Sequence, residues 1–498
     1  MSGTSIAKAA SAKGNQAAAG PPGSIAILGV PFDRVTYAET VRLVERMIAS
    51  RRPHYLATAN VDFVVRAQND IELRRILFDA DLVLCDGAPL VWASRLLGNP
   101  LPERVAGADL VPMLLERGKD TGLRVFFLGG TPDILERAVA NVRSKYRGVV
   151  IAGAFAPPFK PLLEMDHAEI TRRVADAKPD LLLVSFGCPK QEKWIWMHYR
   201  QLGVPVSVGV GATVDFLAGA VSRAPVWMQR CGLEWVYRLC QEPRRLFKRY
   251  FTDIWVFGLA ILRQLAALRS FRRAHPDQPT AVAGEAVVTL AFPARFDAQE
   301  VDVREELWSS VLEKTGGVVA DLSRVRFIDS TGIGLLVRLA KRLRGQNRRL
   351  ILAQPSESVL RALKLMKLES FFKTAADPAS AETLAAGHGT EGARTVLTIP
   401  SASEALAWGG EVTASNTEEI WSATKPHLDW CARHGARATI RLNAVTFLDS
   451  SGLGLMLRVR RYAREHGCAL CFEDASDAVR NVARLAKLES MLLDPPTA

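Results

Sequence analysis

Two stretches of the chain are nearly identical and lie 120 positions apart, and this duplication restricts the fold more than any other feature. VRFIDSTGIGLLVRLAKRL begins at Val325, and VTFLDSSGLGLMLRVRRYA begins at Val445. The phrase KLES recurs at the same spacing, at Lys367 and Lys487. Solenoid repeats have periods of roughly 20 to 50 residues, which is much shorter. The sequence therefore predicts two copies of one small domain.

Each copy has the pattern of a strand, a turn and a helix. The β-like run VRFI or VTFL leads into Asp-Ser-Thr/Ser-Gly, and apolar residues then recur at about every third or fourth position. A chain of 498 residues also exceeds what one hydrophobic core usually serves. We expect a flexible tail at 1–24, a first domain at 25–222, a basic appendage at 223–273, a linker at 274–285, a first repeat domain at 286–376, a second linker at 377–394 and a second repeat domain at 395–498.

The first domain alternates short apolar runs with helical patterns. Runs such as HYLATA, DLVLC, RVFFLG, DLLLVS and VSVGV each precede a turn that contains Gly or a polar residue. This rhythm predicts a Rossmann-like parallel sheet with helices on both faces. Ligands bind such sheets beyond the carboxyl ends of the strands, which is where these turns lie.

Polar residues follow several of these predicted strands. Each has an ordinary structural explanation: Asp86 could cap the next helix, and Gly129 with Gly130 could form a plain βα turn or let the backbone approach a phosphate. Considered together, the polar residues favour a convergent binding site. The candidates are Thr58, Asn60, Asp86, Arg104, Gly129, Gly130, Gln191 and Asp215.

An ordered series of motifs identifies a resemblance. TANVDF, DGAPLVWASRLLG, ERVAGADL, GCPKQEKWI, GVGATVDFLAG, RAP and LEWVYRLCQEPRRLFKRY occur in this order between residues 25 and 255. The region resembles the WecG/TagA/CpsF glycosyltransferases. The resemblance implies transfer of an N-acetylmannosamine-type or related sugar from a UDP-sugar to a polyprenyl-diphosphate-linked saccharide, with inversion expected at the anomeric carbon.

The resemblance also implies roles for single residues. Asp86 matches the carboxylate proposed as general base, while Thr58, Asn60, Arg104 and Gln191 match the lining of the sugar pocket. Asp215 matches a position near the nucleotide. Arg238 and Arg245 match arginines thought to bind the donor diphosphate, and Lys248 keeps the charge of a third such position without its fork. We expect no metal and no cofactor, because no D-x-D motif stands in a suitable turn and cations replace a metal in this family.

The positive charge of the chain is concentrated in the appendage. The formal net charge is +12, and residues 223–273 hold eleven Lys or Arg against three Asp or Glu. The apolar run from Ile254 to Leu262 is too short to span a hydrocarbon layer of about 30 Å. A solvated basic face is one interpretation, and a helix lying on an anionic membrane is the favoured one. We expect no nucleic acid, because no recognised binding motif lies beside this charge.

The two repeat copies resemble STAS domains, the fold of bacterial anti-sigma factor antagonists, whose signature is this Asp-Ser-Ser/Thr-Gly turn. In that family a partner kinase phosphorylates the second hydroxyl residue, which corresponds to Thr331 and Ser451 here. A hydroxyl at a helix start is also an ordinary cap, and many STAS domains act only by docking to a protein partner. Both interpretations remain open at this point.

Cysteine usage and the N-terminus bear on localisation. The seven cysteines have no framework spacing, which favours reduced thiols in the cytoplasm. The pair Cys468 and Cys471 lies in a strand-like pattern without a second pair, so core packing is favoured over zinc. The tail has no apolar core like that of a signal peptide. We expect a cytoplasmic enzyme held at the inner face of the membrane; the alternative is a STAS-based signalling scaffold with a vestigial transferase domain.

Overall fold

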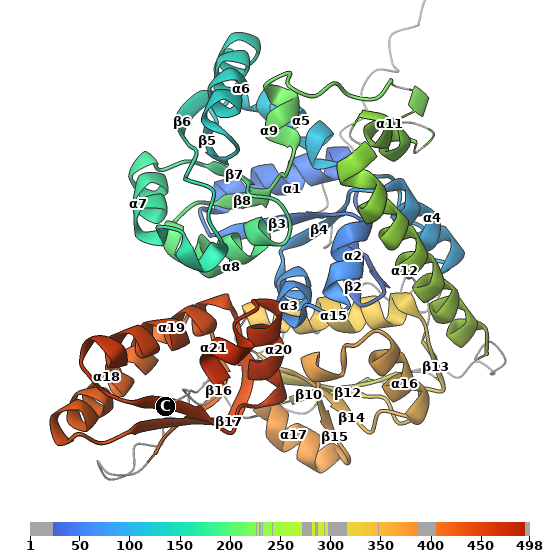
Figure 1. Cartoon of the computed structure of the whole chain (residues 1–498). Helices are drawn as coiled ribbons and strands as arrows, with labels where there is room; N and C mark the ends of the chain where they lie inside the picture. The colour runs from blue at the N-terminus through green and yellow to red at the C-terminus, as the bar shows by residue number, and fades with distance from the viewer. Residues whose placement is uncertain are drawn as a thin grey trace, which may run out of the picture.

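The computed structural model contains three α/β units in chain order (Figure 1), which confirms the predicted fold class. Parts of the expected tail and of both linkers lie outside the described residues. The structure describes residues 23–225, 227–228, 231, 233–241, 243–270, 281–283, 287–292, 294–296, 316–346, 348–386 and 405–493.

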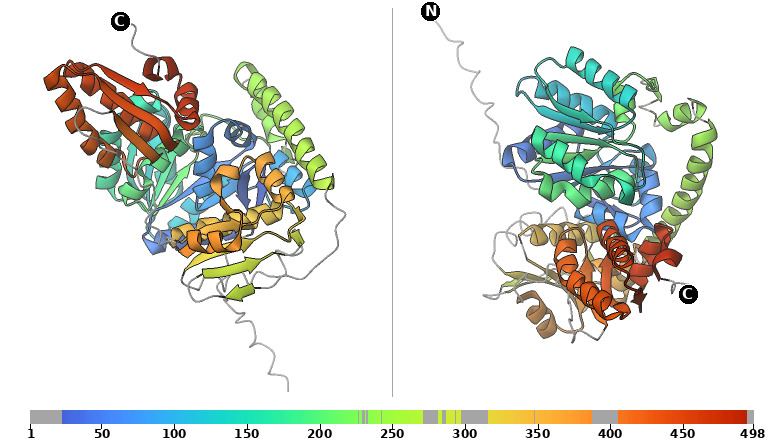
Figure 2. Two further views of the ribbon diagram at one scale, coloured as in Figure 1. Left: turned by 90° about the horizontal axis from the view of Figure 1, so that it is seen from below. Right: turned by 60° about the vertical axis from the view of Figure 1, so that its left-hand side comes forward.

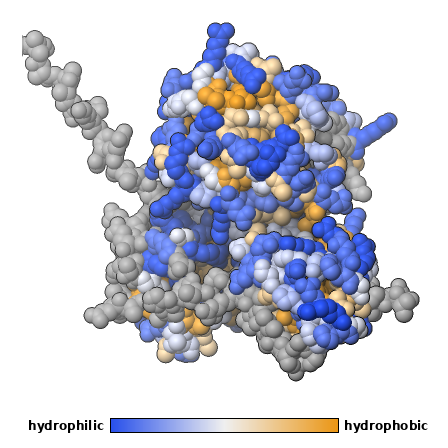
Figure 3. Space-filling model, turned by 90° about the vertical axis from the view of Figure 1, so that its left-hand side faces the viewer, coloured by the Kyte–Doolittle hydropathy of each residue, from blue (hydrophilic) through white to orange (hydrophobic). Residues whose placement is uncertain are grey.

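A six-stranded sheet forms the centre of the first domain. Its order is β4-β3-β8-β7-β5-β6, and all neighbouring strands are parallel, as predicted. The strands are continuous apolar runs because helices cover both faces. They are β3 (His54–Ala59), β4 (Leu82–Cys85), β5 (Arg124–Gly129), β6 (Val150–Phe155), β7 (Leu181–Ser185) and β8 (Val206–Gly209). Strand β6, at one edge of the sheet, was not among the predicted runs. Figure 3, which views the molecule from the left-hand side of Figure 1, shows apolar residues in orange on the upper part of that face.

The two faces of this sheet bury separate hydrophobic clusters. Tyr55 and the alternate residues of β3 belong to one cluster, and Leu56 belongs to the other. The first cluster is completed by α2 (Val61–Ala67), α3 (Ile71–Asp79), α4 (Ala88–Leu96), α7 (His167–Ala177) and α8 (Lys190–Leu202). The second is completed by α1 (Tyr37–Ser50), α5 (Gly107–Gly118), α6 (Pro132–Lys145) and α9 (Thr213–Leu217).

The appendage consists of α11 (Glu234–Gln241) and the long helix α12 (Pro243–Ser270). Figure 2 shows α12 along the outside of the first domain, and Phe257 and Ile261 insert into the core beside α2. Within the described part of the chain, no helix is both long and apolar enough to cross a bilayer.

The first repeat domain has a five-stranded sheet of order β15-β14-β12-β10-β9, in which only the β9–β10 pair is antiparallel. The expected linkers are shorter than predicted, because β9 falls inside 274–285 and α17 falls inside 377–394. Helix α17 packs Ala381 and Ala385 against the sheet, which composition alone did not reveal. The elements are β9 (Ala281–Ala283), β10 (Val287–Ala291), β11 (Arg295–Phe296), β12 (Gly317–Asp321), β13 (Phe327–Ile328), α15 (Ser330–Gly345), β14 (Leu350–Ala353), α16 (Glu357–Leu365), β15 (Lys373–Ala375) and α17 (Pro378–Ala386).

The second repeat domain has a parallel sheet of order β16-β17-β18. In both repeats the aspartate of the duplicated turn caps the following helix. Asp329 accepts hydrogen bonds from the N–H groups of Thr331 and Gly332 at 2.8 and 2.9 Å, and Asp449 accepts one from Gly452 at 2.9 Å. The elements are β16 (Leu406–Val412), α18 (Thr417–His434), β17 (Ala438–Leu448), α19 (Ser450–Glu465), β18 (Leu470–Glu473), α20 (Asp477–Leu485) and α21 (Glu489–Leu493).

The first repeat domain shares a hydrophobic core with the first domain. An N-terminal hairpin of β1 (Ser24–Ile27) and β2 (Val30–Asp33) lies along α15, and the Ser24 hydroxyl donates to the Gly334 carbonyl at 2.9 Å. Phe78 of α3 is fully buried against Phe371 and Phe372, with ring centroids 4.8 and 6.1 Å apart. The two domains are therefore packed as one continuous body.

Replacing Phe78 by alanine should destabilise both domains together. Truncating a buried aromatic ring costs about 3 to 5 kcal/mol, because transfer free energy is lost and a cavity is left. Urea unfolding of the full chain should show this loss in the transition of the first domain as well as that of the first repeat. Phe159→Ala, at a ring that is 96 % exposed, should shift the free energy by about 0.5 kcal/mol at most. A loss confined to the repeat domain would contradict a shared core.

Candidate functional site

The candidate site lies beyond the carboxyl ends of β3, β4 and β8, where the sequence places it. Asp86 directly follows β4, and its N–H donates to the Ala59 carbonyl at 2.9 Å. Asn60 caps α2 by accepting a hydrogen bond from the Phe63 N–H at 3.4 Å. Adjacent parallel strands thus bring Asp86 and Asn60 to the same rim of the sheet.

Asp86 is a carboxyl group held in a largely desolvated position. Burial raises its pKa from 3.8 to about 6, against the lowering effect of Arg104. Glu234 raises the pKa further, whereas Arg238 and the Gly107 N–H lower it. A carboxyl group poised near neutral pH can accept a proton and later release it.

Two arginines and two carboxylates alternate beside Asp86. Arg104 contacts Glu234 at 2.7 Å and Asp109 at 3.2 Å. Arg223 contacts Asp109 at 2.9 Å and Glu234 at 3.2 Å. Glu234 begins α11, so this cluster fastens the appendage over the rim. Asp109, Arg223 and Glu234 were not predicted, although they lie within or beside the motifs ERVAGADL, RAP and LEWVYRL.

The predicted diphosphate-binding residues are only partly placed. The Arg238 guanidinium lies 5.6 Å from the centre of the Phe216 ring, and it is near enough to Asp86 to lower that pKa. Arg245 and Lys248 belong to α12, but their side chains lie outside the described residues. One of the three predicted cations is therefore seen at the rim.

Thr58 and Gln191 make hydrogen bonds within the rim, and their place in the lining of the sugar pocket stays a prediction. The Thr58 hydroxyl donates to the Gly209 carbonyl at 2.9 Å. The Gln191 side chain, 2 % exposed, accepts from the N–H groups of Gly187 and Gly211 at 3.1 and 3.2 Å. Because these groups are used within the protein, both residues position the loops that follow β7 and β8.

The Gly129–Gly130 turn requires its glycines. Their φ angles are +103° and +80°, and a Cβ on Gly129 would lie 2.5 Å from the Ser185 carbonyl oxygen. A Cβ on Gly130 would lie 3.9 Å from Val214 of α9, the short helix that also carries Asp215. The structure thus brings the predicted turn and Asp215 to the same end of the sheet.

Glu192 is a buried carboxyl group that the sequence reasoning missed. It is 3 % exposed and accepts a hydrogen bond from the Gln191 amide at 2.7 Å. Within the described residues, its Oε2 atom has no hydrogen-bond partner. Burial raises its pKa from 4.5 to about 7. Its position next to Gln191 was the only sequence signal.

The two predicted phosphorylation positions are enclosed in this structure. The Thr331 hydroxyl, in a residue that is 2 % exposed, accepts from the Asn99 amide at 2.8 Å. The Ser451 Oγ atom is buried and has no partner among the described residues. Neither hydroxyl is open to a kinase unless its turn first separates from its surroundings.

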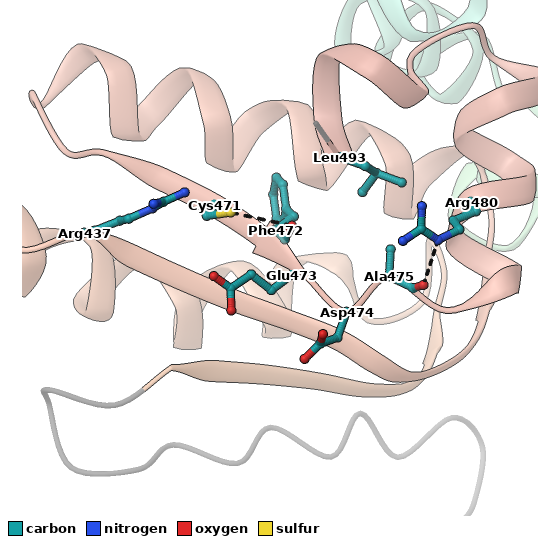
Figure 4. Close-up of a pocket in the computed structure, with 8 residues that line it drawn as sticks. All are labelled: Arg437, Cys471, Phe472, Glu473, Asp474, Ala475, Arg480 and Leu493. Atoms are coloured by element: carbon teal, nitrogen blue, oxygen red, sulfur yellow. Dashed lines mark hydrogen bonds between the residues drawn. The ribbon is translucent and has the colours of Figure 1, made fainter. Parts of the chain in front are cut away.

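The second repeat domain contains a surface hollow and a pair of nearby cysteines, Cys468 and Cys471. A surface hollow in the second repeat domain has side chains of both charges along its wall and lies away from the rim (Figure 4). It is lined by Arg437, Cys471, Phe472, Glu473, Asp474, Ala475, Arg480 and Leu493. Cys468 is buried and Cys471 is partly buried. Among the described residues, no three His, Cys, Asp or Glu side chains lie together as metal ligands, so this cysteine pair is not part of such a group.

The fold and the rim together define a class: a parallel α/β domain with a carboxyl group and arginines beyond the carboxyl ends of its strands. The model of the glycosyl transferase WecG/TagA/CpsF family matches residues 25–271. A Bacillus spizizenii N-acetylglucosaminyldiphosphoundecaprenol N-acetyl-beta-D-mannosaminyltransferase is 31 % identical over 220 residues, covering 44 % of this chain and 80 % of that protein. The chain belongs to the WecG/TagA/CpsF glycosyltransferase family.

Further comparisons concern both halves of the chain. A Staphylococcus aureus (strain MW2) transferase of the same name is 28 % identical over 236 residues, covering 47 % of this chain and 91 % of that protein. The STAS domain model matches residues 278–381, and a second STAS model, "Mlab, STAS domain", matches 396–494. A solved Planctomyces limnophilus STAS domain protein aligns at 22 % identity with a TM-score of 0.20, covering 22 % of this chain and 97 % of that chain. The family models assign both repeats as STAS domains, here named STAS1 and STAS2.

Replacing Glu192 by glutamine should change how stability depends on pH. A folded-state pKa of about 7, above the ordinary 4.5, contributes stability that is complete below pH 4.5 and is lost as the pH rises through 7. The glutamine variant lacks this loss. Relative to wild type, its free energy of unfolding should therefore rise by about 1 to 3 kcal/mol between pH 5 and pH 8. Denaturant unfolding at both pH values is the measurement, and parallel profiles would contradict the shift.

Proposed function

We propose that the chain transfers a sugar of the N-acetylmannosamine type from a UDP-sugar to a polyprenyl-diphosphate-linked saccharide in the synthesis of a bacterial surface glycan. The observation that carries this proposal is Asp86, a desolvated carboxyl group beside arginines at the rim of a glycosyltransferase fold. The names of the relatives support the lipid-linked acceptor and the mannosaminyl group.

The proposed reaction uses Asp86 as general base. The carboxylate takes the proton from the acceptor hydroxyl as that oxygen attacks the anomeric carbon. A new carbon–oxygen bond forms, the bond to the diphosphate oxygen breaks, and UDP leaves with the bonding electrons. A single displacement of this kind inverts the anomeric carbon. Partial desolvation suits Asp86 to this task, because it brings the pKa close to working pH.

The departing diphosphate gains negative charge and needs stabilisation. Arg238 lies beside the rim, and we propose that it acts with Arg245 and Lys248 in place of a metal or other cofactor. Arg104 is held by Glu234 and Asp109, so its role is to fix the appendage and tune Asp86. A donor that contacts α11 would therefore affect the environment of Asp86 through Glu234 and Arg104.

Helix α12 supports membrane association. Its outer surface carries large apolar side chains, with Trp255 66 % exposed, among arginines and lysines. This combination suits the interface of an anionic bilayer, where a polyprenyl acceptor is located. The exposed residues are Phe247, Phe251, Ile254, Trp255, Val256, Leu259 and Leu262. We propose that the protein is peripheral, at the cytoplasmic face of the membrane, and that its STAS domains bind a protein partner.

Asp86→Asn should abolish most of the transfer. Removing a general base lowers kcat by about 10² to 10⁴-fold, whereas binding of UDP should remain. In the wild type, transfer should fall as the pH drops below about 6, because the carboxylate becomes protonated. A panel of UDP-sugars with polyprenyl-diphosphate-linked acceptors is the assay.

The matched control is Asp176→Asn, an exposed carboxylate on α7, which should keep wild-type turnover. A folded Asp86→Asn protein with full activity would remove Asp86 as the base. Bound UDP without turnover for any donor, in the wild type, would favour the alternative of a STAS-based scaffold with a vestigial transferase domain.

Replacing Phe251 and Trp255 by glutamate should weaken binding to vesicles that contain phosphatidylglycerol by at least about ten-fold. The change removes apolar area that the bilayer would bury, and it adds negative charges that anionic lipid repels. Co-sedimentation with vesicles measures the binding affinity. The difference in affinity between anionic and neutral vesicles gives the electrostatic contribution. Phe159→Glu, an exposed aromatic outside α12, is the control. Equal losses in the variant and its control would contradict a membrane role of α12.

A further inference from the structure

Helix α3 of the transferase domain contacts both STAS domains, with different residues for each. Phe78 packs against STAS1, Asp79 pairs with Arg344 of STAS1, and Arg74 donates to the Lys367 carbonyl at 3.0 Å. Glu72 and Arg75, three residues apart on the same helix, face STAS2. Figure 1 shows α3 at the junction of the three domains.

Glu72 binds the signature turn of STAS2. Its Oε1 atom accepts the Ser450 N–H at 2.7 Å, and its Oε2 atom accepts the Ser450 hydroxyl at 2.7 Å. The Glu72 side chain is 2 % exposed, and Lys193 of α8 contacts it at 2.8 Å. A carboxylate here also occupies the positive N-terminal end of α19. The turn is therefore filled by an anionic group from another domain.

Arg75 makes the second contact with STAS2. Its guanidinium contacts the Glu411 carboxylate at 2.7 Å and lies 4.2 Å from the centre of the Phe447 ring. Residues three apart in a helix lie on one face, so Glu72 and Arg75 reach the two parts of the STAS2 surface together. We call this surface, formed by Ser450, Glu411 and Phe447, the STAS2 docking surface.

The two STAS domains are held by different kinds of contact. The STAS1 core includes Ala26 and Phe78 of the transferase domain, so its separation would expose apolar surface. In the described part of the STAS2 interface, Glu72 and Arg75 make the polar contacts, Lys193 supports Glu72 from within the transferase domain, and Leu163 packs against the STAS2 core. Charged contacts exchange more readily for water or for another charged partner than a shared core does.

We propose that STAS2 is a detachable module, that α3 is its built-in ligand, and that its external partner presents a helix with glutamate and arginine three residues apart. Such a partner binds the STAS2 docking surface only after α3 has left it, so docking within the chain inhibits docking between chains. The inference rests on the domain interface and not on the proposed transferase activity.

The charge of the signature turn offers a direct test in the full chain. Ser450→Asp places a third carboxylate beside those of Glu72 and Asp449, where Lys193 and Arg75 are cations of the described residues. Hydrogen exchange of the amides at 450–452 should then accelerate by at least about ten-fold, while β17 stays protected. Ser476→Asp adds the same charge at the N-cap of α20 and should leave exchange unchanged. Combining Ser450→Asp with Glu72→Gln should restore protection, because the amide can donate to the new carboxylate.

A second experiment tests whether α3 occupies the STAS2 docking surface, by measuring the affinity of a peptide for that surface. The probe is a stapled helical peptide that copies residues 69–80, with the positions of Arg74, Phe78 and Asp79 changed to alanine so that it lacks the side chains that contact STAS1. It should bind the full-length Glu72→Ala/Arg75→Ala variant at least about ten-fold more tightly than wild type. Adding Ser450→Asp to that variant should remove binding.

These two arms separate the outcomes. Equal peptide affinity for wild type and variant would overturn occupation by α3, and loss of protection throughout STAS2 in Ser450→Asp would show unfolding instead of release. Protection of 450–452 that is unchanged in Ser450→Asp would overturn the role of Glu72. Loss of transferase activity alone does not bear on any of these results.

Discussion

The crossover from β3 to β4 imposes the constraint on which the molecule depends. The turn that follows β3 presents Asn60 to the rim and the turn that follows β4 presents Asp86, while α3 lies in the crossover and must pack back against the sheet. Because the chain is short here, the outer surface of α3 is fixed relative to the candidate base. Both STAS domains contact that surface, so the nine-residue helix α3 links each of them to the candidate rim.

Much of this architecture could be predicted because short local sequence patterns determine it. Apolar runs before glycine or polar turns gave the parallel sheet, and they brought Asp86, Asn60 and Asp215 to one end of it. The alternating cluster of Arg104, Asp109, Arg223 and Glu234 could not be predicted. Its members are separated by up to 130 residues, and a charged side chain in isolation gives no signal of its partner. For Thr58 and Gln191 the position at the strand ends was predicted, but their hydrogen bonds to backbone groups of other loops were not.

The duplicated phrase illustrates how one local structure can serve two purposes. Asp329 and Asp449 cap their helices in the same way, and this explains why the phrase is kept in both copies. The neighbours that meet the hydroxyls differ: Ser330 meets the neutral amide of Gln264 at 3.0 Å, whereas Ser450 meets the carboxylate of Glu72. No reading of the turn itself distinguishes these environments, because both neighbours come from the other domain. The predicted boundary between STAS1 and the second linker was wrong for a related reason. Helix α17 is rich in alanine, so its composition resembles that of a linker.

Helix α12 has a consequence for the geometry of any larger assembly. Its exposed aromatic residues occupy one part of the helix, while Gln264 near the other end is buried and bonds to Ser330 of STAS1. With 28 residues at 1.5 Å each, the helix is about 42 Å long. The exposed apolar side chains continue along the helix to Leu262, two residues before Gln264. A bilayer that bound this whole surface would therefore hold STAS1 close to the lipid, and a protein recruited through STAS1 would assemble beside the membrane.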